Sequence, residues 1–201
     1  MHVPPPPENE ALRALRVRRT EIQQMLIAET GRLDHAQHKS VLKSLKQHIA
    51  ELKADLAAIE TEIHQLVREN SALNKKVALM RTVIGVGPIS AMTLLAYVPN
   101  IGQLTKGQVA RLAGRAPINN DSGKKRGVRH VQAGRTAIRR ALYMAAVVAM
   151  KANPVLKEFA DRLRSRGYPF KYVATAVMRK LVVILNAILR DGSPWRGAQT
   201  A

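Results

Sequence analysis

Apolar residues recur between positions 42 and 80 in alternating steps of three and four. The positions are Leu42, Leu45, Ile49, Leu52, Leu56, Ile59, Ile63, Leu66, Asn70, Leu73, Val77 and Met80. Because only Asn70 is polar, the pattern predicts one long coiled-coil helix, with Asn70 as a buried polar residue that fixes the register. At about 1.5 Å per residue this helix would be almost 60 Å long. A small domain could not bury the whole apolar stripe.

A shorter amphipathic helix is predicted upstream, from about Glu8 to Glu29, where Thr30 and Gly31 interrupt it. Its apolar face carries Leu12, Leu15, Ile22 and Leu26. Two arrangements could cover the long stripe: pairing with a second copy of the chain, or an antiparallel hairpin with the first helix. We expect both, with a folded hairpin whose exposed part forms a homo-oligomer. Residues 1–80 are therefore predicted to be a coiled-coil dimerisation arm.

The rest of the chain also has helical periodicity, so the predicted fold class is all-α. Apolar helices are expected at about 92–98, 106–112, 136–152, 154–166 and 170–189, separated by Gly, Pro and Asn. Thr105 is the expected cap of the second of these helices. We expect a compact helical domain over residues 81–195 and a short tail over 196–201. The start of the chain does not resemble a signal peptide, and the longest apolar run has ten residues (141–150), too few to span a membrane.

A glycine-rich turn joins the arm to this domain. Gly85 and Gly87 lie in the pattern G-h-G-x-x-x-A, directly before Pro88. Such a pattern between two helices is typical of a helix-hairpin-helix, in which glycines adopt backbone angles that a Cβ forbids and Pro begins the next helix. Free amides of the turn could then hold a DNA phosphate without reading sequence. The alternative is a tight turn that is needed only for packing.

Charge is distributed very unevenly along the chain. Lys and Arg number 33 against 14 Asp and Glu, a net charge of +19. Residues 1–80 hold 12 basic and 10 acidic side chains, whereas residues 81–201 hold 21 and 4. This excess predicts a polyanionic partner for the C-terminal part. The lack of Cys excludes a thiol nucleophile and a Cys-ligated zinc site, and only seven aromatic residues argue against a base-stacking RNA reader.

The basic residues are densest around Ser122. Nine Lys and Arg lie between residues 111 and 140, with Asp121 as the one acid. Asp121-Ser122-Gly123 is predicted to be a turn, at the tip of a small β-hairpin. With the two glycines of the turn above, the predicted nucleic-acid-binding residues are Gly85, Gly87, Lys124, Lys125, Arg126, Arg129, Arg135, Arg139 and Arg140.

Ser122 has two interpretations from its neighbours alone. It is either an ordinary turn residue or a nucleophile whose attack on phosphate the surrounding cations would stabilise. His130 is the nearest imidazole and a weak candidate for proton transfer. A two-metal nuclease centre needs several carboxylates, but residues 81–201 contain only Asp121, Glu158, Asp161 and Asp191. We therefore predict no metal site on this chain, and interpret His35 and His38 as loop histidines.

Four ordered motifs resemble a known family. They are I-G-V-G-P-I-S-A-M-T-L-L-A from residue 84, L-A-G-R-A-P from 112 with S-G-K from 122, A-G-R-x3-R-R-A-L-Y-M-A-A from 133, and R-K-L-V-V-I-L-N-A-I-L-R-D-G from 179. Residues 81–195 resemble the C-terminal transposase domain of the DEDD-type insertion-sequence transposases, the one-ten family. Residues 8–80 are similar to the coiled coil that precedes it.

This resemblance implies a DNA recombinase guided by a structured bridge RNA. It implies that Ser122, the serine of S-G-K, attacks DNA and forms a covalent intermediate. Family members also carry an N-terminal RuvC-like domain with four acidic metal ligands, which has no counterpart in these 201 residues. We therefore expect a truncated or partial transposase, with Mg²⁺ supplied only by a partner's RuvC-like domain.

Two other functions are compatible with the same residues. One is a catalytically inactive nucleic-acid-binding dimerisation module that regulates full-length transposase. A weaker one is a ribosome-associated basic protein. For the transposase and the regulator alike, the expected partners are DNA, a structured guide RNA and a second copy of the chain, with no membrane. The expected location is the bacterial cytoplasm, in association with the nucleoid.

Overall fold

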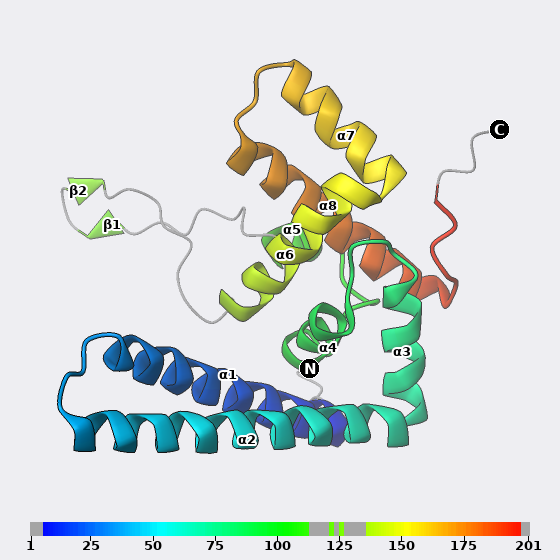
Figure 1. Ribbon diagram of the computed structural model, residues 1–201. Helices are drawn as coiled ribbons and strands as arrows, with labels where there is room; N and C mark the ends of the chain where they lie inside the picture. The colour runs from blue at the N-terminus through cyan, green and yellow to red at the C-terminus, as the bar shows by residue number, and fades with distance from the viewer. Residues whose placement is uncertain (1–5, 113–120, 123–124, 127–135, 198–201) are drawn as a thin grey trace. The chain divides into compact units, whose positions relative to one another are not determined.

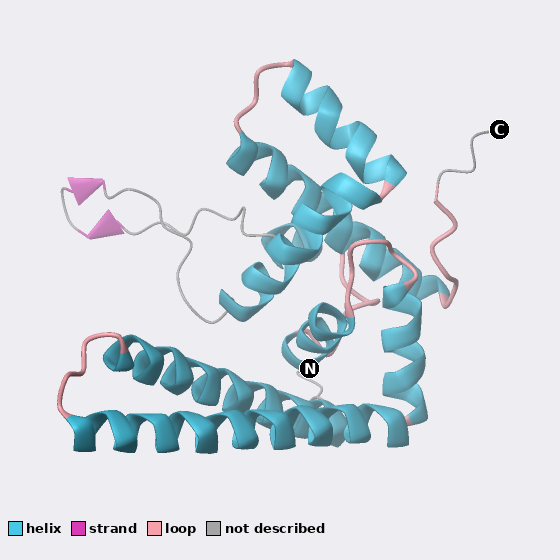
Figure 2. Ribbon diagram, in the orientation of Figure 1, coloured by secondary structure: helices cyan, strands magenta, loops and turns pink. Residues whose placement is uncertain are grey.

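The computed structural model describes residues 6–112, 121–122, 125–126 and 136–197. Most of them are helical, which confirms the predicted all-α class (Figure 2). The helices are α1 (Pro7–Leu33), α2 (Lys39–Glu69), α3 (Ser71–Arg81), α4 (Pro88–Tyr97), α5 (Lys106–Leu112), α6 (Thr136–Ala152), α7 (Pro154–Ser165) and α8 (Phe170–Asp191). Two short strands, β1 (Asp121–Ser122) and β2 (Lys125–Arg126), form a hairpin. The chain divides into two compact units, Met1–Asn74 and Lys75–Ala201.

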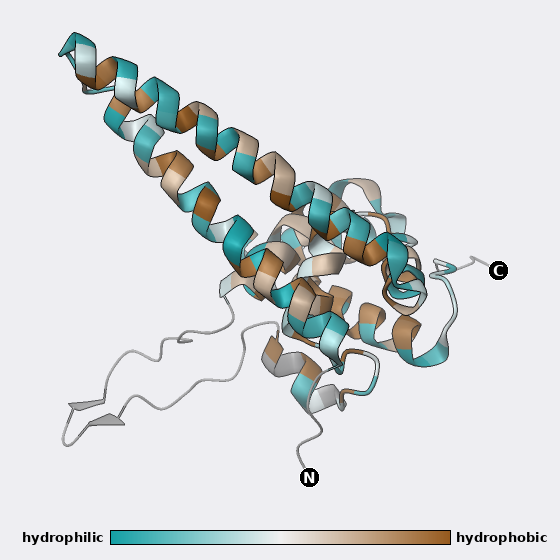
Figure 3. Cartoon of the chain, turned by 90° about the horizontal axis from the view of Figure 1, so that it is seen from below, coloured by the Kyte–Doolittle hydropathy of each residue, from teal (hydrophilic) through white to brown (hydrophobic). Residues whose placement is uncertain are grey.

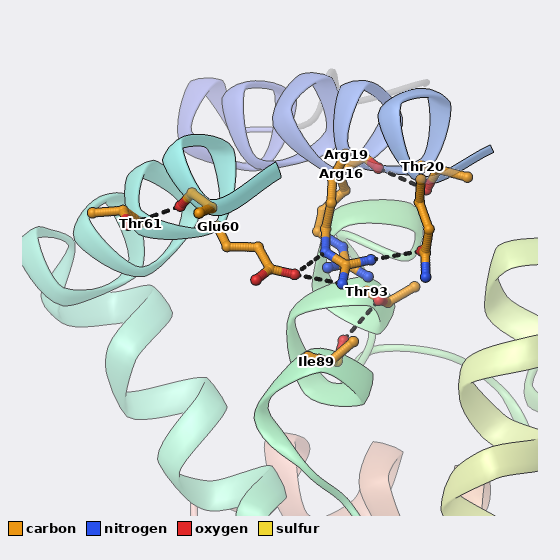
Figure 4. A network of polar contacts seen from close by, with 9 residues as sticks. Arg16, Arg19, Thr20, Glu60, Thr61, Ile89 and Thr93 are labelled. Carbon is orange, nitrogen blue, oxygen red and sulfur yellow. Dashed lines mark hydrogen bonds and ion pairs between the residues drawn. The ribbon is translucent and has the colours of Figure 1, made fainter. Parts of the chain in front are cut away.

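The first unit is built on an antiparallel hairpin of α1 and α2. The two helices pack along each other after a short connection at 34–38 (Figure 1), and apolar positions recur along both (Figure 3). Polar side chains also join them: Arg19 Nε donates to Glu60 Oε1 at 2.8 Å (Figure 4), and His48 Nδ1 lies 3.5 Å from Glu29 Oε1. Of the two arrangements considered for the arm, the folded-back hairpin is therefore present.

Helix α1 is longer than the sequence pattern predicts. It continues through Thr30 and Gly31 to Leu33. The Thr30 hydroxyl donates to the Leu26 carbonyl at 2.7 Å, so it bonds within the helix instead of ending it. Gly31 has open space around its Cα, and a single glycine costs a helix only about 1 kcal/mol.

The long helix is interrupted at Asn70, so the prediction of one continuous helix with Asn70 in a coiled-coil core is wrong. Asn70 has extended backbone angles (φ −92°, ψ 103°) and separates α2 from α3. Its side-chain Oδ1 accepts a hydrogen bond from the Leu73 amide at 2.9 Å. This is the bond of a helix N-cap, which satisfies an amide that has no partner inside the helix. The polar side chain therefore begins α3.

The second unit is organised around α8. Helices α5, α6 and α7 all pack on α8, and α4 packs on α6. The buried face of α8 includes Val173, Val177, Leu181 and Leu185. Helix α8 is also the one helix among the described residues that is long and apolar enough to cross a membrane, but half of its most apolar window is buried inside the structure. Core helices pass the same test of length and composition.

Capping residues set several helix ends in this unit, and Thr105 is the cap that the sequence predicts. The Gln108 amide nitrogen and side chain both bond to Thr105, a reciprocal capping box at the start of α5. Asn153 accepts from the Leu156 amide at 3.3 Å and begins α7 before Pro154. Gly192, at φ +63°, ends α8 with the left-handed residue that commonly terminates helices.

Replacing Asn70 distinguishes a cap from a coiled-coil core position. We expect Asn70→Ala to lower the free energy of unfolding by about 1 kcal/mol because α3 loses its N-cap, whereas Asn70→Ser should retain most of the stability. Urea unfolding followed by circular dichroism measures both. An increase in stability on Asn70→Leu would contradict the cap and support a core position.

Candidate nucleic-acid interface

The glycine hairpin, residues 82–87 between α3 and α4, lies against α6. Gly85 has φ +106°, and a Cβ there would lie 2.7 Å from the Ala149 Cβ and 2.9 Å from the Ala145 carbonyl oxygen. Both the backbone angle and the close approach therefore require glycine. Gly87 differs, because its angles (φ −79°, ψ 168°) suit any residue and a Cβ there would meet no atom within 4 Å. The prediction that both glycines adopt restricted angles is correct for Gly85 and wrong for Gly87.

Polar contacts from distant parts of the chain hold this hairpin. Asn153, buried at the junction of α6 and α7, donates from Nδ2 to the Ile84 carbonyl at 3.3 Å. The Thr82 hydroxyl accepts from the Trp195 amide at 2.8 Å. These two bonds tie the hairpin to the α6–α7 junction and to the segment that follows α8.

The start of α4 lies beside the basic first turns of α6. The Ser90 hydroxyl donates to the Ala141 carbonyl at 3.4 Å, and Ala141 directly follows Arg139 and Arg140. Both arginines are exposed. Gly87 has no side chain with which to cap α4, and Pro88 has no amide hydrogen, so the Ile89 and Ser90 amides of the first turn have no side-chain cap from Gly87. The start of α4 and the first turns of α6, which lie about fifty residues apart in the sequence, are thus adjacent in the second unit.

A β-hairpin at Ser122 is present as predicted (Figure 1), but Asp121 and Ser122 form strand β1, so the prediction that they lie in its turn is wrong. Strands β1 and β2 are antiparallel, with Ser122 opposite Lys125 and Asp121 opposite Arg126. Paired residues in such a ladder have Cα atoms about 5 Å apart, so the backbone of Ser122 is next to that of a lysine. Ser122 is the last residue of its strand. The other predicted binding residues Lys124, Arg129 and Arg135, and also His130, lie outside the described residues.

Two acidic side chains in the second unit, Asp161 and Asp191, form local ion pairs. Asp161 Oδ1 lies 2.8 Å from Arg164 Nη1, and Asp191 pairs with Arg190 at the same distance. The hydrogen bond from Arg190 lowers the pKa of the exposed Asp191 carboxyl, and Asp191 raises that of Arg190. In the described ranges, no three His, Asp or Glu side chains gather as metal ligands.

Sequence reasoning missed the two buried asparagines that position loops. Asn153 was expected only to separate two predicted helices. Asn186 was not singled out, yet its Oδ1 accepts from the Gly102 amide at 2.8 Å and its Nδ2 donates to the Leu104 carbonyl at 3.1 Å. A polar residue within the apolar stripe of residues 173–188 was the available signal.

Alanine substitutions separate the roles of the two hairpin glycines. We expect Gly85→Ala to destabilise the protein by about 2–4 kcal/mol, because the new methyl group overlaps α6 and the left-handed angle is strained. Gly87→Ala, the matched control, should cost less than about 1 kcal/mol. Thermal unfolding of both variants provides the comparison, and equal losses would contradict the close approach at Gly85.

Comparison with known proteins places these elements in a family. Residues 77–161 match the family model described as transposase IS116/IS110/IS902. The chain is 27% identical over 173 residues to an uncharacterized 43.6 kDa protein of insertion element IS110 from Streptomyces coelicolor, covering 85% of this chain and 40% of that protein. It is 28% identical over 199 residues to the pilin gene-inverting protein of Moraxella lacunata, covering 95% of this chain and 61% of that one.

The match extends to a third genus, with 25% identity over 158 residues to an uncharacterized 42 kDa protein of insertion element IS900 from Mycobacterium paratuberculosis. The chain spans between 40% and 61% of the length of these relatives. The glycine hairpin, the β-hairpin and α6 all lie inside the matched range. Residues 77–161 of this chain are therefore a transposase domain of the IS116/IS110/IS902 family.

Proposed function

We propose that this chain acts in DNA transposition or recombination, with its second unit binding the nucleic-acid backbone and Ser122 attacking a DNA phosphodiester. The observation that carries the proposal is the family match over the very elements that form the basic region. The names of the relatives, insertion-element proteins and a pilin gene-inverting protein, describe DNA rearrangement.

The glycine hairpin and α6 supply the backbone contacts in this proposal. Amides in the first turn of α4 would donate hydrogen bonds to a phosphate at the positive end of the helix. The exposed Arg139 and Arg140, beside that turn, would neutralise the same stretch of backbone. Such contacts hold DNA or RNA without reading bases, so the same surface could serve both DNA and a structured guide RNA.

Ser122 supplies the chemistry in this proposal. Its Oγ would attack a DNA phosphorus, forming a serine–phosphate bond as the bond to one deoxyribose oxygen breaks. The serine proton passes to a base, and the departing deoxyribose oxygen takes up a proton to become a hydroxyl group. The cationic sequence around residues 124–129 supports stabilisation of the negative charge that develops on phosphate. We assign Mg²⁺ to a RuvC-like domain of a partner, not to residues of this chain.

The arm is proposed to form the homo-oligomer. Its charge is nearly balanced, so two arms repel each other little. Helices α1 and α2 also expose large apolar side chains that the intramolecular hairpin leaves uncovered: Val17, Met25, Ile27 and Val41. Apolar side chains left uncovered along a helical hairpin favour association with another apolar surface.

The arginines at the start of α6 can be tested through salt dependence. We expect the double variant Arg139→Gln/Arg140→Gln to weaken duplex DNA binding and to reduce the slope of log K against log salt by about two, because two phosphate contacts are lost. Arg190→Gln is the matched control, since that exposed arginine pairs with Asp191 far along α8. Fluorescence anisotropy at several salt concentrations measures both slopes. Equal slopes for the double variant and the control would exclude these contacts.

The nucleophile can be tested by trapping a covalent adduct. The chain is combined with the N-terminal part of a full-length relative and DNA carrying the ends of that relative's element. We expect a protein–DNA adduct that survives denaturation with the unaltered chain, none with Ser122→Ala, and an undiminished one with the control Ser193→Ala. Duplex binding of Ser122→Ala should remain within about twofold of the unaltered chain.

An adduct that persists in Ser122→Ala would rule out Ser122 as the nucleophile. A complete lack of adduct with the unaltered chain, despite DNA binding, would contradict the serine chemistry. That result would favour the non-catalytic module that regulates full-length transposase.

A further inference from the structure

Aromatic residues are scarce in the chain but concentrated at one place. Of seven in the sequence, four lie within residues 159–172: Phe159, Tyr168, Phe170 and Tyr172. They occupy the facing parts of α7 and α8 and the connection between these helices. Phe170 and Tyr168 are exposed. Leaving several large rings in contact with water is unfavourable, which marks the region as a candidate contact surface.

A groove runs between α7 and α8 at these rings. It has a volume of about 370 Å³ and is lined by Phe159, Tyr172, Thr175, Ala176, Arg179, Lys180 and Val183. Six of the seven residues share one stripe of α8, at spacings of three and four, while Phe159 faces them from α7. Such a volume suits a small planar organic group. The stripe continues the amphipathic pattern of α8 on the side opposite its buried core.

The two rings that line the groove, Phe159 and Tyr172, are accompanied by a stacked ring and by cations. Tyr172 stacks on Tyr168 with centroids 4.5 Å apart and planes inclined by 13°. The Lys180 ammonium lies 4.3 Å from the centre of the Phe159 ring, and the Arg162 guanidinium lies 5.7 Å from it. Arg179 is exposed at the groove. Aromatic rings beside cations are the two components with which proteins hold unpaired nucleotides.

The charge around the groove favours a polyanion. Residues 157–180 include seven Lys and Arg and two acids, of which Asp161 already pairs with Arg164. Of the described residues that line the groove, none is acidic. The C-terminal part of a second copy is a poor occupant, because residues 81–201 carry 21 basic and only 4 acidic side chains.

We propose that the groove between α7 and α8 binds an unpaired base of a single-stranded nucleic-acid segment, with the base against Phe159 and Tyr172 and its phosphate on Arg179. The proposal rests on the proposed nucleic-acid binding, but it assigns a second contact, on helices other than the start of α6. Duplex backbone would bind at α4 and α6, whereas unpaired bases would bind here. A structured nucleic acid with looped or melted bases has both duplex backbone and unpaired bases.

A single-stranded oligonucleotide containing 2-aminopurine tests the groove, because the fluorescence of this base falls when it stacks on an aromatic ring. The groove variants are Tyr172→Leu, Phe159→Leu and Arg179→Gln. Tyr143→Leu, which removes an exposed ring from α6, is the matched aromatic control, and Arg190→Gln is the charge control. The full chain is used throughout, and circular dichroism checks that each variant is folded. Affinity for a duplex of the same sequence is measured in parallel.

We expect the unaltered chain to quench the fluorescence and Tyr172→Leu to lose this quenching, with single-strand affinity falling about 5- to 100-fold. Arg179 is exposed, so we expect Arg179→Gln to fold normally. It should reduce the slope of log K against log salt for the single strand by about 0.7. The groove variants should bind the duplex with unchanged affinity. The two control variants should bind the single strand and the duplex as the unaltered chain does.

Three results would overturn the proposal. In the first, the folded groove variants bind and quench the single strand as the unaltered chain does, while Arg139→Gln/Arg140→Gln still weakens duplex binding. The proposed function would then stand, but the groove would have no part in it. Another is equal loss of duplex and single-strand binding in the groove variants. The third is displacement of the oligonucleotide by an acidic peptide as effectively as by unlabelled single strand of equal charge, which would show an acidic-peptide site instead.

Discussion

The contact between Gly85 and α6 determines how the second unit can present its basic residues. At that point the backbone of the glycine hairpin approaches the α6 backbone so closely that no side chain fits between them. The approach places the following residues along α6, so that Ser90 reaches the Ala141 carbonyl. The start of α4 and the basic turns of α6 are therefore adjacent because of a packing requirement. Packing and ligand binding, which appear as alternatives for such a turn, are here compatible.

Buried asparagines hold two loops of the second unit in place, as the Gly85 contact holds the glycine hairpin. Asn153 joins the hairpin to the α6–α7 junction, and Asn186 joins the loop before α5 to α8. Each uses both its donor and its acceptor, so a buried amide is satisfied and a loop is held at the same time. Two loops of the unit are held in this way, and Arg139, Arg140 and Arg179 on its helices are exposed. Preorganised backbone and exposed charge together suit recognition of a polyanion.

Much of the fold follows from local signals in the sequence. Helix α6 has the predicted bounds, Thr105 begins α5, and Asp121-Ser122 lies in a hairpin, because each depends on residues within a few positions of one another. The Asn70 error has a physical origin. A heptad position occupied by Asn looks the same whether the residue is buried between helices or begins a new one, and only the backbone decides.

Long-range features of the site could not be predicted in the same way. The Asn153–Ile84 bond joins residues 69 positions apart, and the Asn186 bonds span more than 80. The aromatic groove was hidden for a different reason. Composition counts seven aromatic rings in 201 residues but does not say where they lie. In the fold, Phe159 and Tyr172 line the same groove from two facing helices. The low aromatic content correctly describes the chain as a whole but not this part of its surface.

The single extended residue at Asn70 also bears on how such an arm can change in evolution. In an uninterrupted helix, inserting one residue turns everything beyond it by about 100° and moves it by about 1.5 Å. Here α3 starts afresh from its own cap, so the backbone angles of one residue can absorb a change in the length of α2. The arm can therefore lengthen or shorten while the register of α3 stays tied to Asn70.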